Sequence, residues 1–173
     1  MIETERYVAK TPTMDDLDLW QELLTNQEIM QYVRKKAHNR EDVINYFMEP
    51  SMKHSAKHGF SMCSIFEKNT QKFVGIAGLI YLAYDDEQSD IEIGCFLHKE
   101  YWKQGCAQEL AAAWFDWGFK HLKLDKIVAV ANPLNENSWR AMERRGMKFI
   151  RNELYDKKYD VVRYEIYNPK SLA

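Results

Sequence analysis

The chain has 173 residues, a net charge of −2 at pH 7 and a sequence pI of about 6.2, and 46% of its residues are hydrophobic. This length and apolar content suit one core, so we expect residues 1–173 to form a single domain. The charge balance argues against a nucleic-acid-binding surface. No apolar run approaches the roughly 20 residues of a membrane span. The charged N-terminus predicts no secretory segment.

Cysteine and histidine usage indicates a metal-free protein of the reducing cytoplasm. Three cysteines form no CxxC pair: Cys63, Cys95 and Cys106. His54 and His58 have an i,i+4 spacing, but no third ligand is evident, so no metal site is predicted. The short basic run Arg34-Lys35-Lys36 lies near acidic residues, and we interpret it as a solvated face.

The N-terminal third predicts a strand followed by helices. Residues 6–10 are a strand candidate, and Thr13 caps a helix whose apolar residues have helical spacing. Residues 28–33 predict a second, short helical piece. Asn39 caps a third helix, which Pro50 kinks or ends. Residues 51–59 are polar and weakly patterned.

The pattern changes to strands after Gly59. Three strands of an antiparallel meander are expected at residues 60–66, 73–82 and 91–97, with a turn at 68–71 and an acidic loop at 85–90. The last strand leads into a charged aromatic turn, a loop with Gly105, and an apolar helix. A strand, a glycine loop and a helix start together can hold phosphate, because the loop amides are free and the helix dipole adds positive charge.

The rest of the chain completes a mixed sheet. The apolar run 127–131 predicts a central strand, parallel to residues 91–97 through a right-handed crossover. Asn135 caps a helix that Gly146 ends, and residues 147–155 and 160–167 predict a closing hairpin. The predicted fold is therefore α/β in the mixed, α+β sense: a mostly antiparallel seven-stranded sheet with helices on both faces.

Three segments resemble the GNAT superfamily of acetyl-CoA-dependent N-acetyltransferases, and most closely its branch of RimJ/RimL-type ribosomal-protein N-terminal and spermidine acetyltransferases. Residues 92–97 resemble the family's fourth strand, and residues 98–109 its pyrophosphate loop. Residues 135–138 and 142–149 resemble its Asn-x-x-Ser helix and closing Gly-Phe region. Trp102 stands where the family loop usually begins with Gln or Arg, and we expect its backbone amide still to serve.

The resemblance implies acetyl-CoA as co-substrate and a set of residues that bind it. The strand would offer backbone groups to the pantetheine arm from Cys95, Phe96 and Leu97. The loop would wrap the pyrophosphate with Trp102, Lys103, Gln104, Gly105, Cys106 and Ala107. Asn135 would reach the pantetheine besides capping its helix. The lysine of the loop either adds charge toward a phosphate or is solvated.

Three residues are candidates for proton transfer. Glu92, on the strand that would hold the thioester, and Glu153, in the closing hairpin where RimL-like relatives carry a glutamate, could act as base through water. Each could equally be a surface charge or bind a cationic acceptor. Ser138 could contact the thioester sulfur as proton donor, because Met142 occupies the position of the tyrosine that many relatives use. Cys106 is not expected to be a nucleophile, because no histidine is spaced to activate it.

The resemblance implies a cytoplasmic N-acetyltransferase that transfers acetyl directly to a primary amine in a ternary complex. Candidate acceptors are a protein N-terminus, a polyamine and an aminoglycoside. The acceptor side would comprise the N-terminal helices, the 81–90 loop and the final hairpin. The acidic loop could attract a cationic acceptor or be an ordinary turn. A non-catalytic acetyl-CoA-binding sensor or interaction module is the alternative, and a homodimer is left open.

Overall fold

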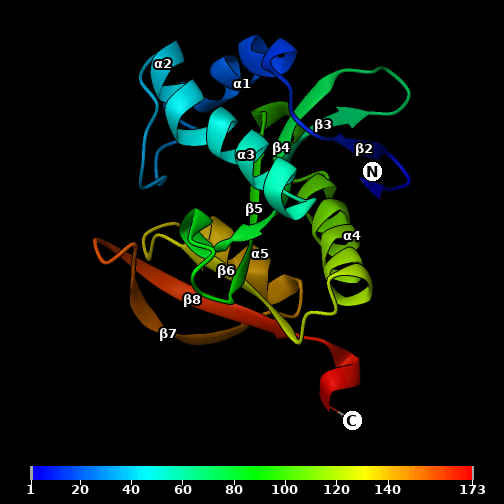
Figure 1. The fold of residues 1–173 in the computed structure, drawn as a ribbon, viewed down its shortest axis with the longest axis vertical. Helices are drawn as coiled ribbons and strands as arrows, with labels where there is room; N and C mark the ends of the chain where they lie inside the picture. The colour runs from blue at the N-terminus through cyan, green and yellow to red at the C-terminus, as the bar shows by residue number, and fades with distance from the viewer. Residues whose placement is uncertain (1, 173) are drawn as a thin grey trace.

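A computed structural model describes residues 2–172 of the chain. Its centre is one sheet of eight strands in the order β1-β2-β3-β4-β5-β6-β8-β7, with helices on both faces (Figure 1). The predicted mixed, mostly antiparallel architecture is confirmed. The strand beyond the predicted seven is β1, which pairs with β2 and has only two residues, too few to show a pattern.

The strands and helices are listed here with their bounds. The strands are β1 (Ile2–Glu3), β2 (Tyr7–Lys10), β3 (Met62–Glu67), β4 (Phe73–Tyr81), β5 (Ile91–Leu97), β6 (Lys126–Ala131), β7 (Lys148–Tyr155) and β8 (Tyr159–Tyr167). The α-helices are α1 (Leu17–Leu24), α2 (Arg40–Val43), α3 (Glu49–His58), α4 (Cys106–His121) and α5 (Glu136–Arg144). Short helical turns are η1 (Met14–Asp16), η2 (Ile44–Met48), η3 (Leu82–Tyr84), η4 (Lys99–Tyr101) and η5 (Pro169–Leu172).

Strand β4 is buried on both faces and separates two parts of the core. Ala77 and Leu79 face the cluster that includes residues of α4 and α5. Ile76 and Ile80 face the cluster under α1 and the segment that follows it. This explains the nearly continuous apolar run of β4, because a strand covered on both sides needs no polar face.

The crossover β5–α4–β6 joins the only parallel pair among the described strands. This pair has one position in register, Glu92 opposite Val128. On its other side β5 is in register with β4 from Ile91 to Leu97. The C-terminal residues of β5 therefore have no strand partner on the β6 side, and the sheet is open there.

One prediction for the N-terminal third is wrong, and one of the two outcomes predicted for Pro50, an end or a kink of the helix, is excluded. Residues 28–33 form hydrogen-bonded turns rather than a helix. Pro50 does not end the third helix, which continues to His58. The π-helical turn η2 ends immediately before α3, so Pro50 lies in the first turn of a restarted helix, where no amide is required from it.

The segment 51–59 is helical up to His58, although its sequence is polar. Ser51 and His54 are buried. The Ser51 hydroxyl lies 2.7 Å from the Tyr84 hydroxyl. His54 Nε2 accepts a hydrogen bond from the Tyr81 amide at 3.0 Å, so Nδ1 carries the proton and donates to the Phe60 carbonyl at 2.6 Å. These contacts hold α3 against the sheet.

Candidate active site

The loop between η4 and α4 presents free backbone amides. Gly105 is the N-cap of α4 with φ 75°, and Lys103 has φ 60°, so the chain turns sharply before the helix. Within residues 2–172, no acceptor is found for the amides of residues 103–107. The Trp102 amide, which we expected to be free for the pyrophosphate, instead donates to the Lys99 carbonyl at 3.0 Å. The amides that could face an anion are therefore those after Trp102.

Arg6, at the start of β2, braces this loop. Its Nε donates to Glu109 at 2.7 Å, and its Nη2 donates to the Gln104 carbonyl at 3.1 Å. The Gln104 side chain also donates to the Glu100 carbonyl. The loop conformation is therefore fixed by neighbouring parts of the chain, and Lys103 has no ion-pair partner within the described chain.

The open edge of β5 presents Cys95 and Leu97. The His98 amide donates to the Val74 carbonyl on β4 at 3.0 Å, so the Leu97 carbonyl, across a trans peptide, points toward β6. There it accepts a hydrogen bond from the Trp102 indole at 2.9 Å. Alternation along the strand turns the Cys95 backbone groups the same way. It turns those of Phe96 toward β4, so a backbone contact from Phe96 to a ligand is not expected.

Glu92 is the buried carboxylate at the base of this opening, with 6% exposure. The Tyr155 hydroxyl donates to its Oε2 at 3.2 Å, and Arg34 Nη2 lies 3.6 Å from its Oε1. The Arg34 guanidinium stacks 3.8 Å above the centre of the Tyr155 ring. Burial raises the pKa of Glu92, and Arg34 and Tyr155 oppose that rise only in part.

Arg34 and Tyr155 are site residues that sequence analysis missed. The interpretation of the basic run as a solvated face is wrong for Arg34, whose side chain is 19% exposed and paired with Glu92. Arg34 lies in the segment between α1 and α2, and Tyr155 at the end of β7. Each contacts Glu92 from more than 50 positions away along the chain, and no local pattern marks such a contact.

Glu153 has different surroundings from Glu92. Its carboxylate pairs with Arg151 at 2.7 Å and with Arg163 at 3.3 Å. Arg163 is 3% exposed in its side chain and also pairs with Asp90 and Glu165, each at 2.6 Å. Glu153 thus belongs to a network of ion pairs on β7 and β8. The residue of β7 that contacts Glu92 is Tyr155, and not Glu153.

Asn135 and Ser138 lie at the start of α5, directly after β6. The Asn135 side chain accepts from the Ser138 amide at 3.2 Å, which confirms the predicted cap. This bond leaves the amide nitrogen of Asn135 available. The Ser138 hydroxyl is half-buried and has no hydrogen-bond partner among residues 2–172. Met142, one turn later, is buried.

The three cysteines are unsuited to nucleophilic chemistry. Burial raises the pKa of the Cys106 thiol to about 11 and that of Cys63 and Cys95 to about 12. Cys106 lies at the N-terminus of α4, which would favour a thiolate, but burial has the larger effect. No group of three His, Cys, Asp or Glu side chains within residues 2–172 could hold a metal ion.

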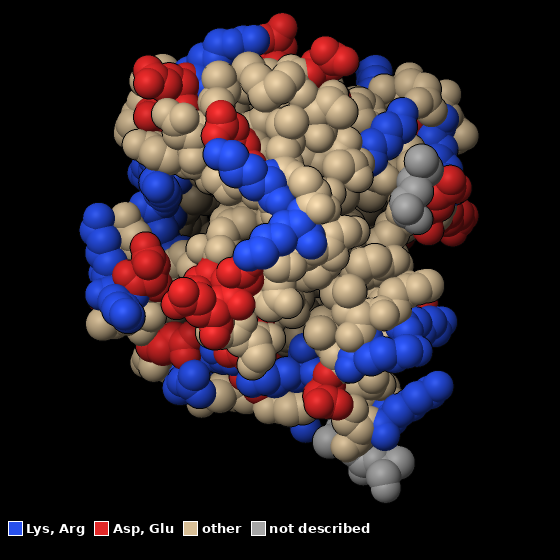
Figure 2. Space-filling model, viewed as in Figure 1, with Lys and Arg blue, Asp and Glu red and all other residues tan. Residues whose placement is uncertain are grey.

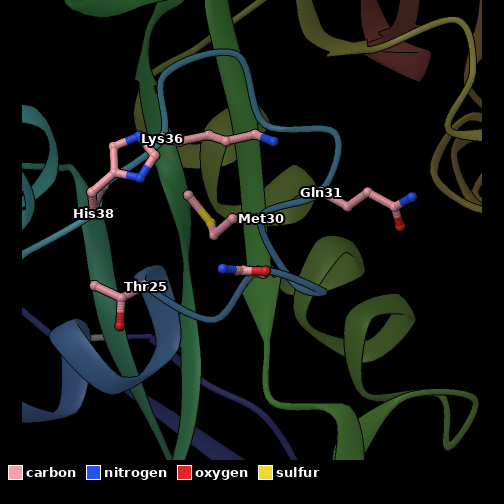
Figure 3. A pocket seen from close by; sticks show the side chains of 7 residues that line it. Thr25, Met30, Gln31, Lys36 and His38 are labelled. Carbon is pink, nitrogen blue, oxygen red and sulfur yellow. The ribbon is translucent and has the colours of Figure 1, made fainter.

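Two adjoining clefts border the segment between α1 and α2. One has a volume of about 370 Å³; its walls include Thr25, Lys36 and His38, with Met30 at its centre (Figure 3). The other, of about 560 Å³, is lined by residues 31–34 and 36, 132–134 and 158–160. Figure 2 shows the molecule hollowed on the left, above the tip of the β7–β8 hairpin, with Lys and Arg side chains beside the hollow.

No helix within residues 2–172 has both the length and the apolar character needed to span a bilayer. The strand edge, the loop amides and the buried carboxylate all lie on β5 or on its C-terminal connection to α4. Sequence analysis located the strand edge and the loop, because both lie within one local stretch. The two clefts had no sequence signal.

Comparison with known proteins identifies the family of the chain. The family described as the acetyltransferase (GNAT) domain matches residues 6–148. The uncharacterised N-acetyltransferase YoaA of Bacillus subtilis (strain 168) is 26% identical over 176 residues, which cover 98% of each chain.

Solved structures show the same fold. A GNAT-family acetyltransferase from Bacillus anthracis is 25% identical with a TM-score of 0.78, covering 96% of this chain and 97% of that one. A spermidine N-acetyltransferase from Vibrio cholerae, in complex with CoA and spermine, has a TM-score of 0.75 at 20% identity, covering 96% and 98%, a likeness of fold alone. The chain therefore belongs to the GNAT acetyltransferase family and is an acyltransferase.

Proposed function

We propose that residues 1–173 form a single domain that transfers acetyl from acetyl-CoA directly to a primary amine, with both substrates bound at once. One observation carries this proposal: the sheet is open beside the C-terminal half of β5, between a buried carboxylate on that strand and free loop amides at the start of α4. Such an opening accommodates an extended amide-containing arm that ends beside a proton acceptor. The finer resemblance to RimJ/RimL-type enzymes and the cytoplasmic location stay predictions.

The donor side fits acetyl-CoA, which supplies an acetyl group activated as a thioester. The amides of residues 103–107 would hold the pyrophosphate together with the dipole of α4. A residue with a side chain would be strained at Gly105, where φ is positive. The backbone groups of Cys95 and Leu97 would bind the pantetheine arm along the open edge of β5, and Asn135 would offer its free amide nitrogen.

Glu92 is the proposed general base. Its burial and raised pKa favour proton uptake nearer neutral pH than a solvated glutamate allows. It would take a proton from the acceptor ammonium or amine, directly or through water, while Tyr155 fixes the carboxylate. Ser138 is the proposed proton donor to the leaving sulfur. We do not assign the role of general base to Glu153, because each of its two carboxylate oxygens pairs with an arginine.

The test is a panel of peptide N-termini, polyamines and aminoglycosides, each offered with acetyl-CoA. Free thiol release and a mass increase of the amine measure transfer. Direct transfer predicts intersecting lines in two-substrate kinetics, and Cys106→Ala retains most activity. Parallel lines with an acetylated protein would contradict direct transfer. Tight acetyl-CoA binding without transfer to any amine would favour the non-catalytic binding module.

A further inference from the structure

The larger cleft has mostly basic charged side chains. Arg34, Lys36 and Lys158 line it, with Asp160 as the one acidic lining residue. Lys36 also lines the smaller cleft, where no carboxylate is found. Neither Lys36 nor Lys158 forms an ion pair with any other described residue, so their charges are not neutralised within the chain. The charge is therefore open to a bound molecule.

This cleft is lined by the ion-pair partner of the proposed base. Arg34 lines the cleft and lies 3.6 Å from Glu92. Residues 132–134, which form another wall, directly follow the end of β6, beside the opening in the sheet. The third wall is the β7–β8 turn. Glu92 itself does not line the cleft, so a molecule there would contact Arg34 and the two lysines and approach Glu92 past the Arg34 side chain.

Glu92 offers little attraction for a polycation. Its charge is already opposed by Arg34, and its second oxygen accepts from Tyr155. Spermidine or an aminoglycoside would bring additional ammonium groups beside Arg34, Lys36 and Lys158. Like charges in a partly enclosed cleft repel one another, which disfavours that binding.

The acidic 85–90 loop does not reverse this balance. Asp86 pairs with Lys57 and also with His58, whose Nε2 lies 2.8 Å from the carboxylate. Asp90 pairs with Arg163 at 2.6 Å and with Lys126 at 3.1 Å. These carboxylates are used within the fold, and none of the loop's residues lines either cleft.

We infer that the acceptor is an amine that carries an anionic group, a carboxylate or a phosphate, in the same molecule. This inference rests on the proposed function, because it places the amine at Glu92. Lys36 and Lys158 bind the anionic group. The amine loses its proton to Glu92 and attacks the acetyl carbonyl, the carbon–sulfur bond breaks, and the thiol leaves with a proton.

The test compares acceptors of matched size and opposite charge. Seryl-glutamate amide is paired with seryl-lysine amide, and phosphoethanolamine with ethylenediamine, so the two pairs separate carboxylate from phosphate. The anionic member of at least one pair should have a kcat/KM about tenfold higher, as expected for two partly screened charges. Lys36→Glu and Lys158→Glu should each reduce this ratio severalfold, and the double variant should abolish it.

Lys170→Glu is the control, because it changes the net charge equally at an exposed residue of η5. The C-terminal segment that contains η5 lies far from the tip of the β7–β8 hairpin (Figure 1). Lys170→Glu should leave the ratio unchanged. Transfer that favours the cationic member of both pairs, or is indifferent to charge, would overturn the inference and leave the proposed function standing.

Loss of the proposed function has a different signature. If no amine is acetylated although acetyl-CoA binds, the proposed function fails. Calorimetric titration of the two dipeptide amides into the CoA-bound protein then decides the inference alone. Tighter binding of seryl-glutamate amide, weakened by Lys158→Glu, supports it, and equal or tighter binding of seryl-lysine amide overturns it.

Discussion

Two buried carboxylates flank the same residue of β6 and behave in opposite ways. Val128 is in register with Glu92 on β5 and with Glu165 on β8. Residues level across neighbouring strands project to the same face of a sheet. Glu92 is 6% exposed and Glu165 is 3% exposed. Their pKa values nevertheless shift in opposite directions.

The difference lies in their partners. Burial raises the pKa of Glu165, but hydrogen bonds from Tyr167, Arg163 and Lys126 outweigh it and lower that pKa to about 2. Burial also raises the pKa of Glu92, where Arg34 at 3.6 Å, the Tyr155 hydroxyl and the Ala83 backbone together do not compensate. Burial alone therefore does not set the charge state. Glu165 is paired with two cations, at 2.6 and 3.0 Å, which makes it structural. The one cation beside Glu92 is 3.6 Å away, which fits the proton exchange proposed for Glu92.

Removing Arg163, the buried cation beside Glu165, should have the largest effect, a loss of stability. Arg163→Met leaves Asp90, Glu153 and Glu165 without their shared partner in a buried setting. Loss of one member of such a network costs about 3–5 kcal/mol in the free energy of unfolding, measured by urea denaturation. Arg151→Met, whose side chain is 56% exposed, should cost less than about 1 kcal/mol. Similar losses for both variants would show that the network is not structural.

Removing the Glu92 carboxylate should lower turnover. Glu92→Gln should lower kcat by about a hundredfold, the typical contribution of a general base, while acetyl-CoA binding is retained. Glu153→Gln is the matched control and should stay within about tenfold of wild type, because it lacks this role. If Glu92→Gln stays within about tenfold as well, direct base catalysis by Glu92 is refuted.

The pH profile tests the partners of Glu92. The base acts when deprotonated, so kcat/KM should rise with pH through a pKa above the ordinary glutamate range. Arg34 lowers that pKa, so Arg34→Gln should move the acid limb of the profile to higher pH. Lys35→Gln alters a neighbouring cation that contacts Tyr46 instead and should leave the limb in place. An acid limb unmoved by Arg34→Gln would mean that another group sets it.

His54 is a third buried titratable group, and it should have the smallest effect, on the pH dependence of stability. Burial lowers the pKa of His54, whose Nε2 accepts from the Tyr81 amide and so must stay unprotonated. The unfolded chain binds the proton more readily, so stability is lost as pH falls below about 6.5, by about 1 kcal/mol or less. His54→Gln should remove this slope, and His121→Gln, an exposed control, should keep it. Equal slopes in all three proteins would exclude His54 as its source.

The sequence predicted the parts of the site whose signals are local. The β5 strand, the Gly105 turn, the Asn135 cap and the helix end at Gly146 follow one another with recognisable spacing, and the structure has each of them. The loop that we propose to hold phosphate could be located for the same reason. Its finer detail could not, because the use of the Trp102 amide within the turn depends on the fold of η4.

The contacts of Glu92 and Glu165 could not be predicted. Arg34 lies in a segment of turns without periodic pattern, and its run of basic residues favoured a solvent-exposed interpretation. Arg163 alternates correctly for a strand, but the sequence does not show that its face is covered. Which charges meet across four strands is decided by tertiary packing, and that information is not contained in local spacing.

The π-helical turn η2 sets the angular phase of α3. One additional residue in a helical turn rotates everything after it by about 100°, the angle between successive residues of an α-helix. Ser51 and His54, which follow this turn, are buried against the sheet. Deleting one residue within 44–48 would turn that polar pair by the same angle, away from its present contacts. The insertion therefore works as a rotational adjustment that lets a polar helix bind the sheet through two specific side chains.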